Sequence, residues 1–234
     1  METGRAVDLN ADLGEEVTDD AALLAVVTSA NVACGYHAGT AAIMRAVCAE
    51  AAERGVSVGA QVSYDDREGF GRVARDVPSE VLREQVADQV GTLSSIAAGA
   101  GTVVRYVKPH GALYHRVIDD EEQAAAVLAG SGDLPVLGMP GRFLDLAGAA
   151  GREMRLEGFP DRGYAAGGRL LPRGEPGALL EDADAIAAAA LGLAPRVDSL
   201  CLHGDTPGAV VNARAVRAAL EADGWTLRAP WGRG

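Results

Sequence analysis

Apolar residues along the chain gather into short runs, and a longer segment with polar ends and helical spacing separates each run from the next. The runs predict seven strands, at residues 6–10, 28–33, 56–60, 102–109, 135–139, 154–157 and 200–202. The segments between and after them predict seven helices, at residues 19–27, 40–54, 78–98, 119–129, 142–150, 182–191 and 209–222. Because strand and helix alternate throughout, we expect a parallel sheet.

The strand runs are mostly apolar on consecutive positions, which is typical of parallel strands whose two faces are both covered. Seven strand–helix units in 234 residues favour an α/β fold, a seven-stranded parallel (β/α) barrel. A doubly wound open sheet is the alternative, because periodicity does not distinguish an open sheet from a closed one. The chain contains neither a low-complexity linker nor a sequence repeat, so we expect residues 1–234 to form a single domain.

The stretch from residue 102 to residue 115 changes character abruptly in its middle. Its first half is β-branched and aromatic, and Lys108, Pro109 and His110 follow directly. Proline cannot donate to a sheet ladder, so the strand is expected to end there. A cation and an imidazole are thereby delivered side by side to the C-terminal end of a strand, where α/β folds keep their chemistry.

Polar residues follow other predicted strands in the same way, and the parallel strands of a barrel aim their C-terminal loops at one mouth. Three of the four histidines follow strands closely. The polar residues that we expect to meet at this mouth are Asn10, Asp12, Glu15, Asn31, His37, Gln61, Lys108, His110, Asp161, Arg162, His203 and Asp205. Histidines grouped with carboxylates in one mouth indicate an active site.

Two kinds of chemistry suit this set of side chains. Carboxylates and imidazoles can hold a divalent metal that generates hydroxide from water. They can also perform metal-free acid–base catalysis, in which Lys108 stabilises an oxyanion and Asp12 or Asp205 holds a histidine in one tautomer. The metal-free alternative is favoured, because the sequence has no compact ligand motif and His110 and His115 are five residues apart.

The charge and the absence of certain motifs argue against several classes of binding partner. The formal charge of −12 and the pI near 4.7 argue against non-specific binding to nucleic acid or to anionic lipid. The sequence has no phosphate-binding loop and no dinucleotide-binding glycine motif, so we expect no nucleotide site of its own. It also shows no signal sequence and no apolar segment long enough to span a membrane, which predicts a cytoplasmic protein.

Six motifs, spread in order along the chain, carry a resemblance to a known family. They read VDLNADLGE, SANVACGYHAG, VKPHGALYH, EGFPDRGY, LLPRGEPGALLED and CLHGDTPGAV. Together they closely resemble the LamB/YcsF family from about Val7 to about Leu220, which is nearly the whole chain. Six separate motifs in register are a highly specific signal.

This resemblance implies a fold, an activity and partners. The implied fold is a seven-stranded parallel barrel similar to that of polysaccharide deacetylases. The implied activity is that of the A subunit of an ATP-dependent 5-oxoprolinase, which opens the lactam of 5-oxo-L-proline to give L-glutamate. The implied partners are the B and C subunits, through which ATP would act as co-substrate. The resemblance leaves open whether the chain forms a homo-oligomer and whether it binds a divalent metal.

The family's polar signature falls on matching positions of this chain. The catalytic centre that the resemblance implies comprises Asp12, His37, Lys108 and His110. Lys108 would hold the developing oxyanion or the substrate carboxylate. The substrate-binding residues that it implies are Asn10, Glu15, Asn31, Tyr114, Arg162, His203 and Asp205, and we expect Gln61 to join them because it follows a strand at the same mouth. Arg162 is the second choice for the substrate carboxylate, because a guanidinium grips a carboxylate through two hydrogen bonds.

The chain departs from the family pattern at three positions. Gln61 stands where the family usually has histidine, Thr40 where it has an acid, and His115 where it has asparagine. Glutamine binds metals poorly and cannot act as a base near neutral pH. Two other functions therefore stay open. One is a metal-dependent deacetylase or amidohydrolase that acts alone, by analogy with the deacetylase fold, and the other is a non-catalytic regulatory subunit.

Overall fold

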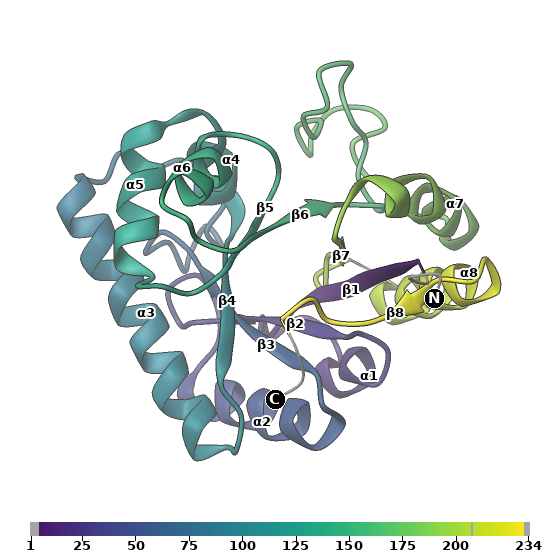
Figure 1. The fold of residues 1–234 in the computed structure, drawn as a ribbon, viewed down its shortest axis with the longest axis horizontal. Coiled ribbons are helices and arrows are strands. Elements are labelled where there is room, and N and C mark those ends of the chain that lie inside the picture. The colour runs from purple at the N-terminus through teal and green to yellow at the C-terminus, as the bar shows by residue number, and fades with distance from the viewer. Residues whose placement is uncertain (1–4, 207, 232–234) are drawn as a thin grey trace.

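Seven parallel strands close into a barrel in the computed structural model of the protein, which describes residues 5–206 and 208–231 (Figure 1). The strands are β1 (Ala6–Leu13), β2 (Ser29–Ala33), β3 (Ser57–Val62), β4 (Val104–Pro109), β5 (Val136–Gly138), β6 (Met154–Gly158) and β7 (Ser199–Leu202). They pair in sequence order from β2 to β7, and β1 joins β7 to β2. The predicted barrel is therefore confirmed, and the open sheet is wrong.

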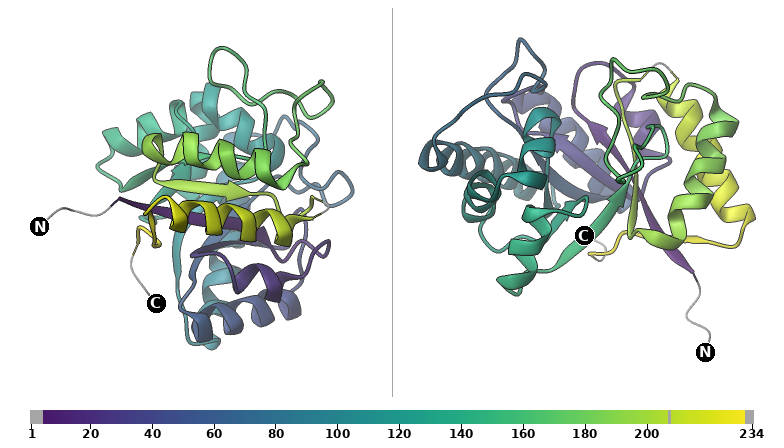
Figure 2. Two further views of the ribbon diagram at one scale, coloured as in Figure 1. Left: turned by 90° about the vertical axis from the view of Figure 1, so that its right-hand side faces the viewer. Right: turned by 90° about the horizontal axis from the view of Figure 1, so that it is seen from above.

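Helices cover the outer side of the barrel (Figure 2). They are α1 (Asp20–Leu24), α2 (Ala41–Arg54), α3 (Ser79–Gly99), α4 (Gly111–Asp119), α5 (Glu121–Gly130), α6 (Arg142–Ala149), α7 (Ala183–Leu193) and α8 (Ala209–Ala222), with a 3-10 turn, η1 (Ala194–Arg196). Every predicted helix is present, with its ends shifted by at most three residues. Across residues 5–206 and 208–231, no helix combines the length and the apolar character that a membrane span requires.

Helix α4 is an element that the hydrophobic pattern does not predict. It begins directly after β4 at Gly111, whose φ of +57° lies in the left-handed region that favours glycine. Asp120 separates α4 from α5 and caps α5, because its side chain accepts a hydrogen bond from the backbone of Gln123. The crossover after β4 is therefore two short helices where the sequence pattern suggests one.

The C-terminal segment adds a further strand outside the ring. β8 (Thr226–Leu227) pairs in parallel with the start of β1, so that Thr226 lies opposite Ala6. Beyond β8, the ring of Trp231 stacks on the ring of Tyr106, with 4.0 Å between their centroids. Tyr106 belongs to β4, so the tail contacts the barrel strands directly.

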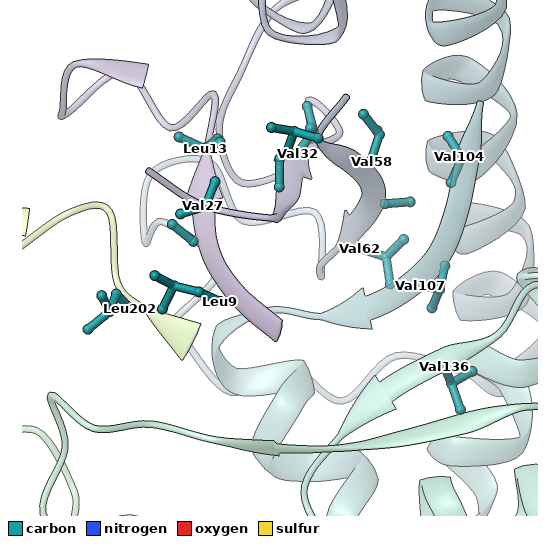
Figure 3. Packing of buried hydrophobic residues seen from close by; sticks show 14 of the residues in the cluster. Leu9, Leu13, Val27, Val32, Val58, Val62, Val104, Val107, Val136 and Leu202 are labelled. Carbon is teal, nitrogen blue, oxygen red and sulfur yellow. The ribbon is translucent and has the colours of Figure 1, made fainter. Parts of the chain in front are cut away.

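The two faces of the barrel wall differ in chemistry, because alternate residues of a strand point to opposite sides. Leu9, Val58 and Val107 point outward and belong to the hydrophobic layer between strands and helices (Figure 3). Asp8 and Asp12 of β1 point the other way and are buried. The barrel interior is thus a polar core, in contrast to the apolar filling that is usual for parallel barrels.

Candidate active site

The polar interior begins with a buried carboxylate, Asp8. Its oxygens accept hydrogen bonds from the hydroxyls of Thr28 (2.6 Å), Ser29 (2.8 Å) and Ser199. Burial raises the pKa of Asp8 to about 6, and the three hydroxyls offset that rise only in part. These bonds connect β1 to β2 and β7, so Asp8 supports the barrel.

One buried cation, Lys108, lies at the centre of the interior. Its ammonium nitrogen is 3.1 Å from Asp12, 3.0 Å from Glu157 and 2.9 Å from the sulfur of Cys201. Burial disfavours the charged amine, but Asp12 and the other neighbours outweigh it and raise the pKa of Lys108 well above its ordinary value. Burial would likewise raise the pKa of Asp12, and Lys108 reverses that effect and lowers it. The two groups are therefore a permanent ion pair near neutral pH.

Amide and phenol groups hold these charges in place. Asn31 donates to Asp12 at 2.9 Å and to Asn10 at 2.6 Å, and Tyr106 donates to Asn31 at 2.7 Å. Asn10 in turn donates to Glu157 at 3.2 Å. Because these links join β1 to β2, β2 to β4 and β1 to β6, the position of Lys108 depends on several strands of the barrel.

Two histidines and a carboxylate meet where β1, β2 and β4 end. Oε1 of Glu15 lies 3.7 Å from Nε2 of His37 and 3.6 Å from Nδ1 of His110, and the rings of the two histidines are stacked. Burial lowers the pKa of both histidines, that of His37 to about 4, so both rings are neutral at pH 7. Neutral imidazoles and a carboxylate are ligands that divalent transition metals prefer. This triad of Glu15, His37 and His110 could therefore hold such an ion.

A separate histidine, His203, follows β7 and pairs with Asp161, which follows β6. Asp161 accepts hydrogen bonds from the Nδ1 of His203 at 2.9 Å and from its backbone N–H at 3.0 Å. Burial would raise the pKa of Asp161, but His203 outweighs it and lowers the pKa, so the carboxylate is ionised and can only accept. Nδ1 of His203 therefore carries a proton, and in the neutral form of the ring the lone pair is on Nε2. This tautomer is the one that a general base requires.

A cavity of about 340 Å³ opens at the C-terminal ends of the strands. The polar residues of its described lining are Asp12, Arg72, Lys108, His110, Tyr114, His115, Arg162, Arg173 and His203. Four of these side chains are lysine or arginine and one is a carboxylate, although the chain as a whole has a formal charge of −12. The lining therefore brings together four cationic groups that an anionic ligand could contact, and carboxylates already pair with three of them: Lys108 with Asp12 and Glu157, and Arg72 and Arg173 with Asp205.

The long segment between β6 and α7, residues 159–182, forms one wall of this cavity and extends away from the barrel (Figure 1). Arg162 holds the segment together by donating to the carbonyl oxygens of Leu171 (2.6 Å) and Ala178 (3.0 Å). Arg173 of the same segment contributes to the lining. The positive charge of the wall thus depends on a segment with little regular structure.

Some of the residues predicted from the sequence line the cavity, and others are buried in the barrel outside its lining. Asp12, Lys108, His110, Tyr114, Arg162 and His203 line the cavity. Five others are buried, with exposed fractions of at most 5%, and lie outside the described lining of the cavity: Asn10, Glu15, Asn31, His37 and Gln61. Asp205 forms ion pairs with Arg72 and Arg173. The prediction that Asp12 or Asp205 holds a histidine in one tautomer is corrected here, because Asp205 is engaged by arginines and Asp161 holds His203.

Three residues of the site are not among those predicted from the sequence: Glu157, Arg72 and Arg173. Glu157 faces inward from β6, where Lys108 pairs with it and Tyr114 donates to it at 3.0 Å. A carboxylate inside a predicted strand is a usable signal, because a buried charge needs a partner. The two arginines lie in irregular segments, whose path cannot be read from hydrophobic periodicity.

Comparison with known proteins places these residues in a family. The family model described as LamB/YcsF family matches residues 7–232. A protein of Streptomyces avermitilis, named as the A subunit of 5-oxoprolinase, is 55% identical over 242 residues, which cover 93% of this chain and 97% of the relative. The range matched by the family model includes every residue of the cavity and of the triad.

Two solved structures extend the comparison. The crystal structure of a lactam utilization protein from Thermus thermophilus has a TM-score of 0.89 and 35% identity, covering 96% of this chain and 99% of that one. A family 4 carbohydrate esterase from Streptomyces lividans in complex with acetate has a TM-score of 0.52 and 12% identity, covering 99% of this chain and 97% of that one. The second likeness shows the fold alone. The sequence motifs, the family model and these relatives agree that the chain belongs to the LamB/YcsF family.

Proposed function

We propose that this chain is the A subunit of an ATP-dependent 5-oxoprolinase, which opens the lactam of 5-oxo-L-proline to L-glutamate together with B and C subunits. Support comes from the relatives, one of which is named as the A subunit of 5-oxoprolinase and another as a lactam utilization protein. ATP would enter through the partner subunits, because this sequence has no phosphate-binding loop.

The observation that carries the proposal is the group of four cationic side chains that lines the cavity of an acidic protein: Arg72, Lys108, Arg162 and Arg173. The substrate has one carboxylate beside a compact polar ring, and the cavity volume of about 340 Å³ is within the range of small-molecule sites. Arg162 already donates to the carbonyls of Leu171 and Ala178, and its remaining N–H groups would bind the carboxylate. Lys108, held at the inner end by Asp12 and Glu157, would face the lactam carbonyl.

We assign the role of general base to His203. A water molecule attacks the lactam carbonyl carbon and gives a proton to Nε2 of His203, while the partners would couple the ring opening to hydrolysis of ATP to ADP and phosphate. The ammonium group of Lys108 stabilises the negative charge on the carbonyl oxygen. The C–N bond then breaks, and His203 passes the proton to the ring nitrogen, which leaves as the amine of glutamate. Asp161 keeps Nδ1 protonated and so positions the ring.

Reconstitution of the complete enzyme tests this proposal. The purified chain is combined with B and C subunits, ATP and 5-oxo-L-proline, and glutamate release is measured. His203→Asn and Asp161→Asn should each lower kcat by about 100-fold or more. The double variant should be no slower than His203→Asn alone, because residues that act as a unit are not additive. Arg54→Gln, which removes an exposed ion pair with Glu50 on α2, is the control and should retain activity.

Two results would count against the proposal in different ways. If the losses multiply in the double variant, His203 and Asp161 do not act as one base, although the overall function could stand. If the complete wild-type mixture releases no glutamate, the function itself is refuted.

A second function is favoured by one observation, the triad of Glu15, His37 and His110. It is a hydrolase that acts alone on an N-acylated substrate with the help of a divalent metal. An ion held by the triad would supply Lewis acidity beside the cavity. In the corresponding test, the chain alone is assayed on N-acetylated sugars with and without chelator. Hydrolysis that a chelator abolishes and that ATP and the partners do not affect would favour this function over lactam opening.

A further inference from the structure

We propose that Glu15, His37 and His110 form a binding site for one divalent transition metal ion, with Zn²⁺ as the ion that the donors suit best. The three residues come from separate segments, just after β1, between β2 and α2, and at the end of β4. Two imidazoles and one carboxylate, with a fourth position open, are a donor set of catalytic zinc sites. The site belongs to this chain alone, so the proposal holds whichever substrate the cavity accepts.

The separations between the donor atoms fit a single ion. Oε1 of Glu15 is 3.7 Å from Nε2 of His37 and 3.6 Å from Nδ1 of His110, and all three donors lie within 4.8 Å of one another. Two ligands bound at about 2.0–2.1 Å in tetrahedral geometry lie roughly 3.3–3.4 Å apart. Small side-chain rotations would close this gap. Because the two rings are stacked at an angle of 12°, one ring must tilt for both lone pairs to reach the same ion.

His110 is already oriented as a metal ligand. Its Nε2 donates to the backbone carbonyl of Phe70 at 3.1 Å, and a carbonyl can only accept, so the lone pair is on Nδ1 and faces Glu15. Metal-binding histidines usually donate their second nitrogen in this way, which fixes tautomer and ring orientation. The loop above is tightly packed, because a Cβ on Gly71 would lie 2.9 Å from Cβ of His37 and 3.0 Å from Cδ2 of His110. The contacts that hold the two histidine side chains from outside the site are therefore already formed.

His37 has polar atoms that the surrounding protein leaves unsatisfied. Its exposed fraction is 1%, and neither ring nitrogen has a hydrogen-bond partner among the described residues. Buried polar atoms in native proteins almost always have a partner, so two unsatisfied nitrogens on one ring call for an explanation. An ion between His37, Glu15 and His110 would satisfy Nε2 of His37.

Gln61 supplies a second, independent indication of a cation at the same point. Its Nε2 donates to Oε1 of Glu15 at 3.1 Å and to Nδ1 of His110 at 3.0 Å, so the positive end of the amide faces two of the proposed ligands. Its Oε1 is buried and has no partner among the described residues. Rotation of the amide by half a turn would exchange the two atoms and make Oε1 a fourth, weaker ligand. Gln61 can thus either donate hydrogen bonds to two of the ligands or become a ligand itself.

Metal binding by the purified chain tests the proposal. The chain is stripped with chelator, dialysed and titrated with ZnCl₂ by calorimetry, and bound metal is counted by elemental analysis. We expect one ion per chain, and CoCl₂ should give the visible absorption of Co²⁺ held by nitrogen and oxygen ligands. Glu15→Gln and His37→Asn should each weaken the affinity by more than about 100-fold, because loss of an outer partner alone costs about 10–100-fold. His115→Asn, at a histidine of the cavity lining outside the triad, is the matched control and should bind as the wild type does.

Gln61→His tests the same geometry in the opposite direction. An imidazole at this position adds a strong donor and should tighten binding by about 10-fold or more, a gain that a folding defect cannot imitate. The proposal is overturned if the wild type shows no saturable binding, or if Glu15→Gln and His37→Asn fold and bind as well as the wild type. It is also overturned if His115→Asn weakens binding as much as His37→Asn does. The readout is bound metal and not turnover, so failure here is distinguishable from failure of the 5-oxoprolinase function.

Discussion

Lys108→Met is the substitution that tests the organisation of this barrel most directly. Methionine keeps the length and the apolar stem of lysine but removes the charge. Asp12 and Glu157, which lie 3.1 and 3.0 Å from the ammonium nitrogen, would then be buried carboxylates without a cation. Both carboxylates have side chains that are at most 5% exposed, so little water contacts them in the folded protein.

The expected cost follows from these distances. At an effective dielectric constant of about 20, two unit charges about 3 Å apart interact by roughly 5 kcal/mol. Desolvation of the lysine offsets part of that gain, and removal of one partner of a buried ion pair typically costs about 3–5 kcal/mol. We therefore expect Lys108→Met to lower the free energy of unfolding by about 4 kcal/mol. That is a large share of the roughly 5–15 kcal/mol available to a domain.

A double-mutant cycle separates this charge effect from the loss of packing. Glu157→Gln neutralises one of the two carboxylates, so its combination with Lys108→Met should cost about 1–3 kcal/mol less than the sum of the single variants. Urea unfolding measures all four proteins, and equal m-values confirm that the transitions are comparable. Arg54→Met is the matched control, because its ion pair with Glu50 is exposed and should contribute less than about 1 kcal/mol. Additivity of Lys108→Met and Glu157→Gln within about 0.5 kcal/mol would refute the electrostatic account.

Three further predictions concern the barrel wall, the polar interior and the cavity. Gly59→Ala should destabilise the protein by about 1–3 kcal/mol, because a Cβ there would lie 2.3 Å from the ring of Tyr106. Gly91→Ala, on the open surface of a helix, is the control and should not destabilise the protein. Thermal unfolding of the two variants measures the difference. The pKa of Asp8 is about 6 in the folded protein, above its value in the unfolded chain. Asp8 therefore contributes about 3 kcal/mol to the free energy of unfolding below about pH 4, and this contribution is lost as the pH rises through 6. Asp8→Asn should remove this dependence, and urea unfolding from pH 4 to 7 that shows the same slope in both proteins would contradict it. Arg162→Lys should raise KM more than it lowers kcat, because lysine keeps the charge but cannot bridge the two carbonyls of the cavity wall; steady-state kinetics of the reconstituted enzyme measures both constants.

The strands and most of the helices could be predicted because their signals are local, whereas the closure of the sheet into a barrel has no local signal. Runs of valine, alanine and leucine mark the strands, and Thr40 and Gly55 mark the two ends of α2, where they serve as N-cap and C-cap. Helix α4 has no such mark. It begins at Gly111, immediately after a proline and a histidine, and this sequence is equally compatible with a turn. Where the local signal is ambiguous, tertiary packing decides, and packing is not visible in a single sequence.

The contacts of the site depend on strand register, which the sequence does not reveal. Glu157 of β6 lies opposite Ser199 of β7, and Asp161 and His203 each follow four residues later. Their pairing is a direct result of that register. From the sequence, both residues are expected at the same mouth, but Asp12 or Asp205 is expected to be the partner of a histidine, because the alignment of the strands cannot be read from the sequence. A polar set at one mouth is therefore predictable, and its pairwise geometry is not.

The charged side chains of the barrel interior are distributed unevenly along its axis. Within the described interior, Lys108 pairs with Asp12 and Glu157, while Asp8 below it has hydroxyl partners. Glu15 above it has neutral imidazoles and an amide within 3.7 Å. Burial raises the pKa of both outlying carboxyls, which is the response expected of acids without a close cation. At the lower end, protonation of Asp8 can remove the excess charge. At the upper end, where two neutral imidazoles converge on Glu15, a divalent ion would do so, and the same ion would bring positive charge to the edge of the cavity.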